Sequence, residues 1–177
     1  QGIRWSLEEI GDMEVVGEAE NGQEAIKLAE RLLPDVVLVD INLPGLNGLE
    51  VARVIKRRDP RIAMIVLSVY EDDDQLFQAI KVGAAAYSSK DVHPNALITM
   101  IRDVARGRYL INESVLAKPH VATRVLHQFR ELASTEDEQT SALFAPLTSR
   151  EIEILDCIAR GLSNKDIANE LSISGQT

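Results

Sequence analysis

The stretch that decides the fold is VVLVDINLPGLNG, residues 36–48. Four consecutive aliphatic residues end at an acid, Asp40, and a proline and two glycines follow. An unbroken apolar run of this kind is typical of a strand in a parallel sheet that is buried on both faces. Pro44 and Gly48 are residue types that allow a sharply turning loop. The stretch therefore predicts a central strand that carries one carboxylate to the rim of a sheet.

Strands and helices are predicted to alternate on both sides of this stretch. Further strands are predicted at 13–19, 62–68 and 84–90, and helices at 21–33, 49–57, 72–82 and 94–106. This alternation predicts an α/β fold with a doubly wound parallel sheet. Because chemistry in such sheets gathers at the carboxyl ends of the strands, the positions of Asp40, Ser68 and Lys90 at or just past three strand ends are notable.

The pattern becomes purely helical after Asn112. Residues 115–132 are predicted to form a helical connector opened around Pro119, and the polar, acidic residues 133–146 a flexible linker. Two short helices then follow, each opened by a capping box and joined by a turn at Gly161, which indicates a helix-turn-helix. The predicted boundaries are 1–112 for the first domain, 113–145 for connector and linker, and 146–177 for an all-α second domain.

Composition narrows the class of protein. Hydrophobic residues make up 45% and charged residues 27% of the chain, which is typical of packed globular domains. No apolar run approaches the roughly 20 residues of a membrane helix, so no membrane association is expected, and a cytoplasmic protein is the simplest interpretation. Cys157 is the single cysteine and is predicted to be a buried small hydrophobe. The net charge of −9 argues against non-specific coating of nucleic acid.

Three side chains at the strand ends have complementary chemistry. An isolated aspartate at such a place is more often a solvated strand terminus than a catalytic group. Here Ser68 adds a hydroxyl and Lys90 adds a mobile point cation that can meet a carboxylate or a phosphoryl oxygen. Together with Asp40 they suit covalent chemistry in which an aspartate accepts a phosphoryl group.

Several ordered motifs resemble one family over nearly the whole chain. DINLPGLNG, LSVYEDDD and GAAAYSSK resemble the phosphoacceptor, switch-hydroxyl and lysine segments of receiver domains, and LTSREIEILDCIARGLSNKDIANELSIS resembles a LuxR-type helix-turn-helix. The sequence is thus similar to response regulators of the NarL/FixJ class. The resemblance implies a flavodoxin-like sheet followed by a DNA-binding domain.

The resemblance also implies roles for individual residues of the first domain. Asp40 would be the phosphoacceptor, and the backbone carbonyl of Asn42 would bind Mg²⁺ beside it. Ser68 would hydrogen-bond the phosphoryl group, Tyr87 would swing inward in response, and Lys90 would pair with the phosphoryl charge. The phosphoryl group adds close to two negative charges and strong hydrogen-bond acceptors, which is consistent with such a rearrangement.

Two departures from the family pattern concern the ends of the sequence. Family members begin with a strand ending in an acidic pair that binds Mg²⁺, whereas Glu8, Glu9 and Asp12 here lie on or after a predicted helix. The sequence is therefore expected to be a piece truncated at both ends. Without the first strand, the sheet should have a gap beside residues 13–19 and 36–40, and Asp40 should be a poor phosphoacceptor, because Mg²⁺ requires octahedral oxygen ligation.

In the second domain the sequence ends as a third helix begins. The residues expected to contact DNA are Asn164, Lys165 and Thr177, and phosphate contacts alone would specify no base sequence. The predicted core of this domain consists of aliphatic side chains, namely Ile154, Leu155, Ile158, Ile167, Ala168 and Leu171.

Three functions are compatible with these features. The preferred one is a phosphorylation-gated transcription regulator, not an enzyme, whose partners are a sensor histidine kinase, promoter DNA and a second copy of itself. A haloacid-dehalogenase-type phosphatase would need a second acid two residues after its nucleophile, where Asn42 stands. A pseudo-receiver governed by protein contacts rather than phosphate is the third.

Overall fold

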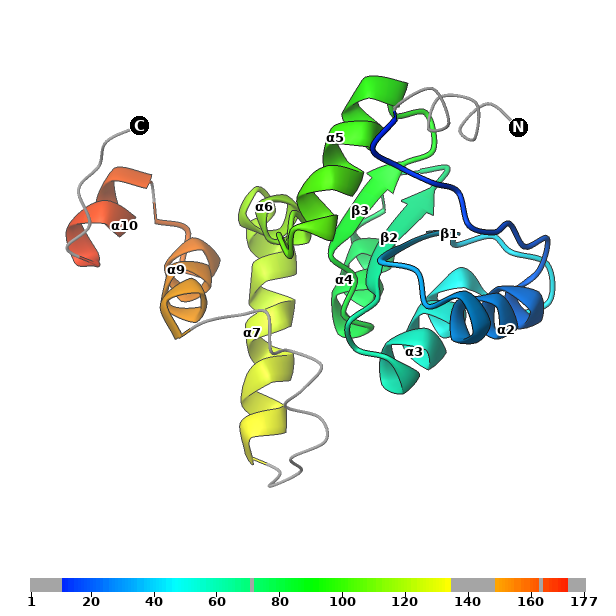
Figure 1. Ribbon diagram of the computed structural model, residues 1–177. Coiled ribbons are helices and arrows are strands. Elements are labelled where there is room, and N and C mark those ends of the chain that lie inside the picture. The colour runs from blue at the N-terminus through cyan, green and yellow to red at the C-terminus, as the bar shows by residue number, and fades with distance from the viewer. Residues whose placement is uncertain (1–10, 71, 135–148, 163, 172–177) are drawn as a thin grey trace. The chain divides into compact units, whose positions relative to one another are not determined.

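The computed structural model describes residues 11–70, 72–134, 149–162 and 164–171 (Figure 1). The chain divides into two compact units, residues 1–111 and 112–177. The first unit contains the sheet and the second is helical.

The first unit alternates strands and helices as the sequence predicts. Its elements are α2 (Gly22–Leu32), β1 (Val36–Asp40), α3 (Gly48–Arg58), β2 (Ala63–Ser68), α4 (Asp73–Lys81), β3 (Ala86–Ser89) and α5 (Pro94–Ala105). The three strands are parallel, in the order β1-β2-β3. The predicted α/β class with a parallel sheet is confirmed.

Helix boundaries in this unit follow from capping side chains. Asn21 accepts a hydrogen bond from the backbone of Glu24 at 3.0 Å and opens α2. Asn47 opens α3 and forms a capping box with Glu50. Asp72 opens α4 by accepting from two backbone N–H groups. Such caps satisfy N–H groups that have no partner within the helix, which fixes where each helix begins.

The sheet is covered on both faces. Ile65 and Leu67 of β2 pack with Leu97, Ile98 and Ile101 of α5. Because successive strand residues point to opposite faces, the intervening residues of β2 point away from α5, toward the side on which α3 packs. Figure 1 shows α5 on one side of the sheet and α3 and α4 on the other.

Two sequence predictions about the sheet are wrong for the described residues. β1 was expected to be central and buried on both faces, yet within this part of the chain it is an edge strand, and of its five residues Val39 alone is buried. Residues 13–19 form no strand. Strand geometry needs a hydrogen-bonded neighbour, and the described structure places none beside this segment. Met13 and Val15 instead pack partly buried against the α5 cluster.

The second unit comprises α6 (Ile111–Leu116, which begins at the boundary), α7 (Pro119–Ser134), α9 (Ser149–Ala159) and α10 (Asn164–Glu170). The predicted connector is helical, and α7 begins at Pro119, around which the sequence predicts its opening; proline is favoured in a first helical turn. α7 packs against α9. The predicted linker lies mostly outside the described residues.

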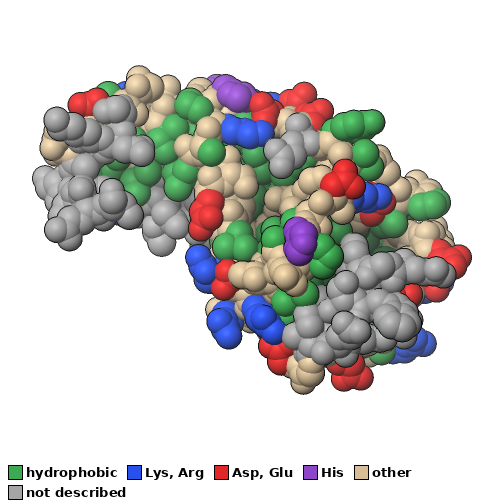
Figure 2. Space-filling model, turned by 90° about the horizontal axis from the view of Figure 1, so that it is seen from above, with side chains coloured by type: hydrophobic (Ala, Val, Ile, Leu, Met, Phe, Trp, Pro, Cys, Tyr) green, Lys and Arg blue, Asp and Glu red, His purple; other side chains and the backbone are tan. Residues whose placement is uncertain are grey.

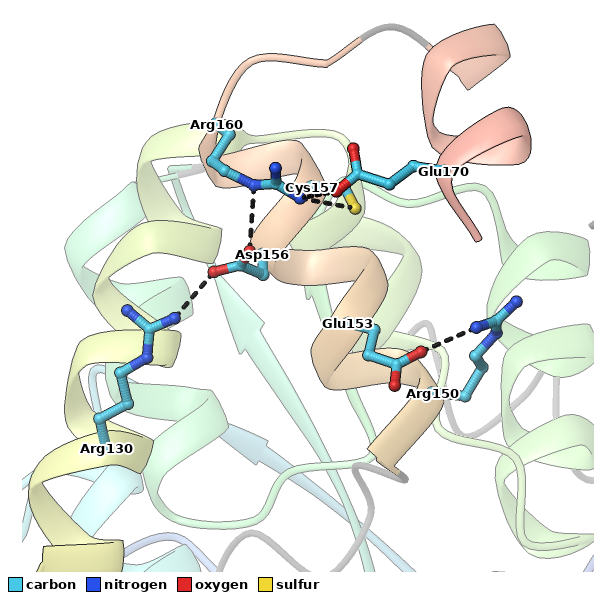
Figure 3. A network of polar contacts seen from close by, with 7 residues as sticks. All are labelled: Arg130, Arg150, Glu153, Asp156, Cys157, Arg160 and Glu170. Carbon is cyan, nitrogen blue, oxygen red and sulfur yellow. Dashed lines mark hydrogen bonds and ion pairs between the residues drawn. The ribbon is translucent and has the colours of Figure 1, made fainter. Parts of the chain in front are cut away.

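An ion-pair network joins three helices of this unit (Figure 3). Asp156 of α9 accepts from Arg130 of α7 at 2.8 Å and pairs with Arg160 at 3.0 Å. Arg160 also reaches Glu170 of α10 at 2.6 Å. The Asp156 carboxylate thus connects α7 to α9, and the Arg160 guanidinium, directly after α9, connects that helix to α10.

Packing of the helix-turn-helix segment largely follows the sequence prediction. Leu155 and Ile167 are buried, as is Cys157, whose predicted burial is confirmed. Ile154, Ile158 and Leu171 are half-buried, and the side chain of Ala168 lies outside the description. The turn after α9 uses Gly161 at a φ of 75°, a conformation that glycine adopts without strain. Among the described residues, no helix is long and apolar enough to cross a membrane.

Candidate functional site

The register of the strands brings the predicted site residues together at the carboxyl ends of the strands. Asp40 ends β1 opposite Leu67, and Ser68 ends β2 opposite Ser89. The backbone N–H of Lys90 donates to the carbonyl of Ser68 at 2.8 Å. The ends of all three strands therefore lie side by side, as expected for the carboxyl edge of a parallel sheet.

Both oxygens of the Asp40 carboxylate are engaged. Oδ1 accepts a hydrogen bond from the backbone N–H of Asn42 at 2.9 Å. Oδ2 accepts from the ammonium group of Lys90, so the two side chains form an ion pair. The Asp40 side chain is 25% exposed and that of Lys90 36%. The carboxylate is thus held in place and still reachable from solvent.

The loop after Asp40 packs so closely that Gly48 has no room for a side chain. Its N–H donates to the carbonyl of Ile41 at 2.9 Å. A Cβ at this position would lie 2.0 Å from the carbonyl oxygen of Asp40. A glycine is therefore required at this position of the loop, and α3 begins at this same residue.

The Ser68 side chain is buried, with 1% of its surface exposed, and it is directed toward α4. Its hydroxyl lies 2.5 Å from Oε1 of Gln75 and 2.7 Å from the carbonyl oxygen of Tyr70. The backbone N–H of Tyr70 donates to the same hydroxyl at 3.3 Å. These bonds hold the hydroxyl in the loop between β2 and α4.

Tyr87 of β3 reaches the same loop. Its hydroxyl lies 3.1 Å from the Tyr70 carbonyl oxygen and 3.4 Å from Oε1 of Gln75. It accepts a hydrogen bond from the backbone N–H of Asp72, the α4 cap, at 3.3 Å. The hydroxyls of Tyr87 and Ser68 therefore lie near the same two oxygen atoms, although the two residues are nineteen positions apart in the sequence.

Sequence reasoning missed Gln75. It lies in the first turn of α4, where Asp72 caps its backbone N–H at 3.3 Å. A glutamine near a helix start carries no distinctive pattern. The available signal was its spacing of seven residues from Ser68, across a loop and into the helix predicted at 72–82, since that spacing lets the first helical turn face back to the strand end.

The described residues do not provide a Mg²⁺ site by themselves. Asp40 offers one carboxylate and Asn42 one backbone carbonyl, whereas Mg²⁺ prefers six oxygens in octahedral geometry. Within the described ranges, no three His, Cys, Asp or Glu side chains gather where they could hold a metal. Asp12 is paired with Arg102 of α5 at 2.9 Å, which keeps the pKa of its carboxyl low, and Glu8 and Glu9 lie outside the described residues.

The residues predicted to contact DNA are only partly described. Asn164 and Lys165 form the start of α10, and their side chains lie outside the description, as does all of Thr177. Figure 2 shows basic side chains lying among acidic ones on the face in view. This mixture agrees with the net charge of −9, which does not favour non-specific binding to nucleic acid.

The parallel sheet, with Asp40 and Lys90 paired at the carboxyl ends of its strands and a helical unit after it, agrees with the receiver domain and helix-turn-helix that the sequence predicts. The family model described as the response regulator receiver domain matches residues 1–102. The model for bacterial regulatory proteins of the luxR family matches residues 145–177. The chain belongs to the response regulators that combine a receiver domain with a LuxR-type domain.

Individual relatives agree with this assignment. The chain is 35% identical over 177 residues to the uncharacterized transcriptional regulatory protein YxjL of Bacillus subtilis, covering all of this chain and 78% of that one. It is 36% identical over 179 residues to the nitrate/nitrite response regulator NarL of Escherichia coli, covering 99% and 77%. Among solved structures, the receiver domain of the putative NarL regulator of Mycobacterium tuberculosis matches with a TM-score of 0.58 and 32% identity, over 60% of this chain and 86% of that one.

Proposed function

We propose that the carboxylate of Asp40 accepts a phosphoryl group from a sensor histidine kinase and that this modification controls DNA binding by the second unit. The observation that carries the proposal is the ion pair between Asp40 and Lys90 at the carboxyl edge of the sheet. In the transfer, the bond between phosphorus and the kinase histidine nitrogen breaks, and a bond between phosphorus and an Asp40 oxygen forms. Histidine leaves as imidazole.

The neighbouring side chains would respond to the added charge. Lys90 already lies against the carboxylate and would pair with the phosphoryl oxygens, to which an ammonium can move as a point charge. The Ser68 hydroxyl would leave the α4 loop to donate to a phosphoryl oxygen. Tyr87 would then move toward the space it vacates, which would change the surface formed by α4, β3 and α5.

A divalent metal would assist this chemistry. Mg²⁺ would supply positive charge beside the transferring phosphoryl group. Asp40 and the Asn42 carbonyl are the described groups that would ligate it, and the remaining ligands would come from water or from residues outside the description.

The output would be sequence-specific binding to promoter DNA in the cytoplasm, by a homodimer on paired half-sites. Asn164, Lys165 and Thr177 would contact DNA, with Lys165 as a phosphate contact. The match of residues 145–177 to the luxR family supports this part of the proposal. The function is regulatory rather than enzymatic, in keeping with the transcriptional regulators among its relatives.

Labelling of the complete protein by acetyl phosphate in the presence of Mg²⁺ tests the phosphoacceptor. Asp40→Asn should abolish a label that hydroxylamine and alkali remove, as they do from an acyl phosphate. Asp91→Asn is the matched control, because Asp91 is an exposed aspartate directly after Lys90, and it should leave the label unchanged. Equal labelling of wild type and Asp40→Asn would exclude Asp40 as the acceptor. Absence of any label from all three proteins would instead favour a pseudo-receiver.

A further inference from the structure

Two hydroxyl groups share the same two acceptor oxygens, one in the loop before α4 and one in the first turn of α4. The Ser68 hydroxyl lies 2.5 Å from Gln75 Oε1 and 2.7 Å from the Tyr70 carbonyl oxygen. The Tyr87 hydroxyl lies 3.4 Å and 3.1 Å from the same two atoms. These hydroxyls come from two neighbouring strands, and Gln75 comes from α4.

The distances show which of the two hydroxyls bonds more closely to the amide oxygen of Gln75. A hydroxyl carries one proton, and hydrogen bonds between two oxygens are normally 2.5–3.0 Å long. The amide oxygen of Gln75 is therefore bonded tightly to Ser68 and only loosely to Tyr87. If Ser68 donates its proton elsewhere, this oxygen loses its closer donor, and Tyr87 is the donor that remains within reach.

We propose that Gln75 is a positioning residue that couples Ser68 to Tyr87: whether Ser68 donates to Gln75 determines how strongly Gln75 accepts from Tyr87. When the Ser68 hydroxyl leaves, the Gln75 amide oxygen accepts fully from Tyr87 and draws the phenol toward the start of α4. That Ser68 leaves upon phosphorylation rests on the proposed function above. The exchange between the two hydroxyls does not, because it requires only that the Ser68 donor be removed.

The position of Gln75 suits this role. It is half-buried, and its backbone N–H is held by the α4 cap Asp72 at 3.3 Å, so its side chain starts from a fixed point. The backbone N–H of Asp72 in turn donates to the Tyr87 hydroxyl at 3.3 Å. A change in the bond between Gln75 and Tyr87 would therefore act directly on the residue that begins α4. The Tyr70 carbonyl oxygen lies near both hydroxyls as well, but it belongs to the backbone and cannot turn toward Tyr87 as a side-chain amide can.

A double-mutant cycle without phosphate tests the proposal. The protein has three tyrosines, so 3-fluorotyrosine gives three fluorine resonances, and Tyr87→Phe identifies the one from Tyr87. Ser68→Ala removes the competing donor and should shift the Tyr87 resonance. In the Gln75→Leu background the same Ser68→Ala change should shift that resonance by less than half as much. A shift in Gln75→Leu of half the wild-type size or more would overturn the proposal.

Two further variants separate coupling from general disturbance of the helix. Gln78→Leu makes the same substitution one turn later on α4, and there Ser68→Ala should shift the Tyr87 resonance as in wild type. Gln75→Glu keeps an acceptor oxygen at the same reach and should restore at least half of the shift. Loss of the shift in Gln78→Leu, or failure of Gln75→Glu to restore it, would show that Gln75 is merely part of the helix packing. Since none of these measurements uses phosphate, a failed labelling experiment at Asp40 leaves their outcome intact.

Discussion

The ammonium group of Lys90 donates to Oδ2 of Asp40 across fifty residues of sequence. The pair exists because parallel strands place their carboxyl ends at one edge, and because the Lys90 backbone N–H is itself bonded to the carbonyl of Ser68 at 2.8 Å. The cation is therefore positioned by the sheet and not by its own flexible side chain alone.

Lys90→Met should change the free energy of unfolding by less than about 1 kcal/mol, because ion pairs at partly exposed sites contribute little. Met64→Ala is the contrasting variant, since Met64 is fully buried in β2 and its truncation should cost about 2–5 kcal/mol. Urea unfolding followed by circular dichroism measures both. A loss of more than about 2 kcal/mol in Lys90→Met would show that the ion pair is a structural element of the fold.

Gly48→Ala should destabilise the first unit by at least about 1–3 kcal/mol, the usual cost of overpacking. The added Cβ would lie 2.0 Å from the Asp40 carbonyl oxygen, and backbone cannot move aside as a side chain can. Gly11→Ala is the matched control, because a Cβ there meets nothing within 4 Å, and it should stay within about 0.5 kcal/mol of wild type. Thermal or urea unfolding measures the stability of both variants. Equal stability of the two would contradict the close approach of Gly48 to the Asp40 carbonyl.

Sequence reasoning located the elements of the first unit well because their signals are local. Apolar runs, the caps Asn21 and Asp72, and a proline at the start of α5 each act within a few residues. It failed for residues 13–19, since being a strand depends on a partner elsewhere in space. Gln75 was missed for a similar reason: its importance comes from where α4 places its first turn, not from any pattern around it.

In the second unit, too, local features could be predicted from the sequence and long-range contacts could not. The helical character of α7 follows from its apolar spacing, and a break before Pro119 could be expected from proline alone. That α7 packs on α9 could not be predicted, because the contact depends on how two amphipathic faces meet. Arg130 and Asp156 are twenty-six residues apart, and their pairing has no signal in the sequence.

Low pH should lower the free energy of unfolding partly by protonating Asp59, the C-cap residue of α3. The Arg61 guanidinium donates to its carboxylate at 2.8 and 2.9 Å, and the Arg61 backbone N–H adds a third bond, which lowers the pKa of Asp59 from 3.8 to about 2. Because the folded pKa lies below the unfolded value, this stabilisation is present above about pH 4 and is lost as the pH falls through about 2.

Asp59→Asn should therefore lower the free energy of unfolding at pH 5, and the gap from wild type should narrow toward pH 2. Arg61→Met should give the same narrowing, because it removes the principal cause of the pKa shift. Urea unfolding at a series of pH values measures the gap. A difference between wild type and Asp59→Asn that stays constant from pH 5 to pH 2 would contradict the assignment.

Asp156→Asn should destabilise the second unit by about 1 kcal/mol. The Asp156 carboxylate pairs with both Arg130 and Arg160, so its loss affects the contact of α7 with α9 (Figure 3). Glu153→Gln is the control on the same helix: Glu153 pairs with Arg150 one turn before it, both side chains are largely exposed, and the change should cost less than about 0.5 kcal/mol. Hydrogen exchange of the α7 amides, at low and high salt, measures the local effect. The cost of Asp156→Asn should shrink at high salt, since ions screen partly exposed pairs. Faster exchange in Glu153→Gln than in Asp156→Asn would show that the network does not hold α7 in place.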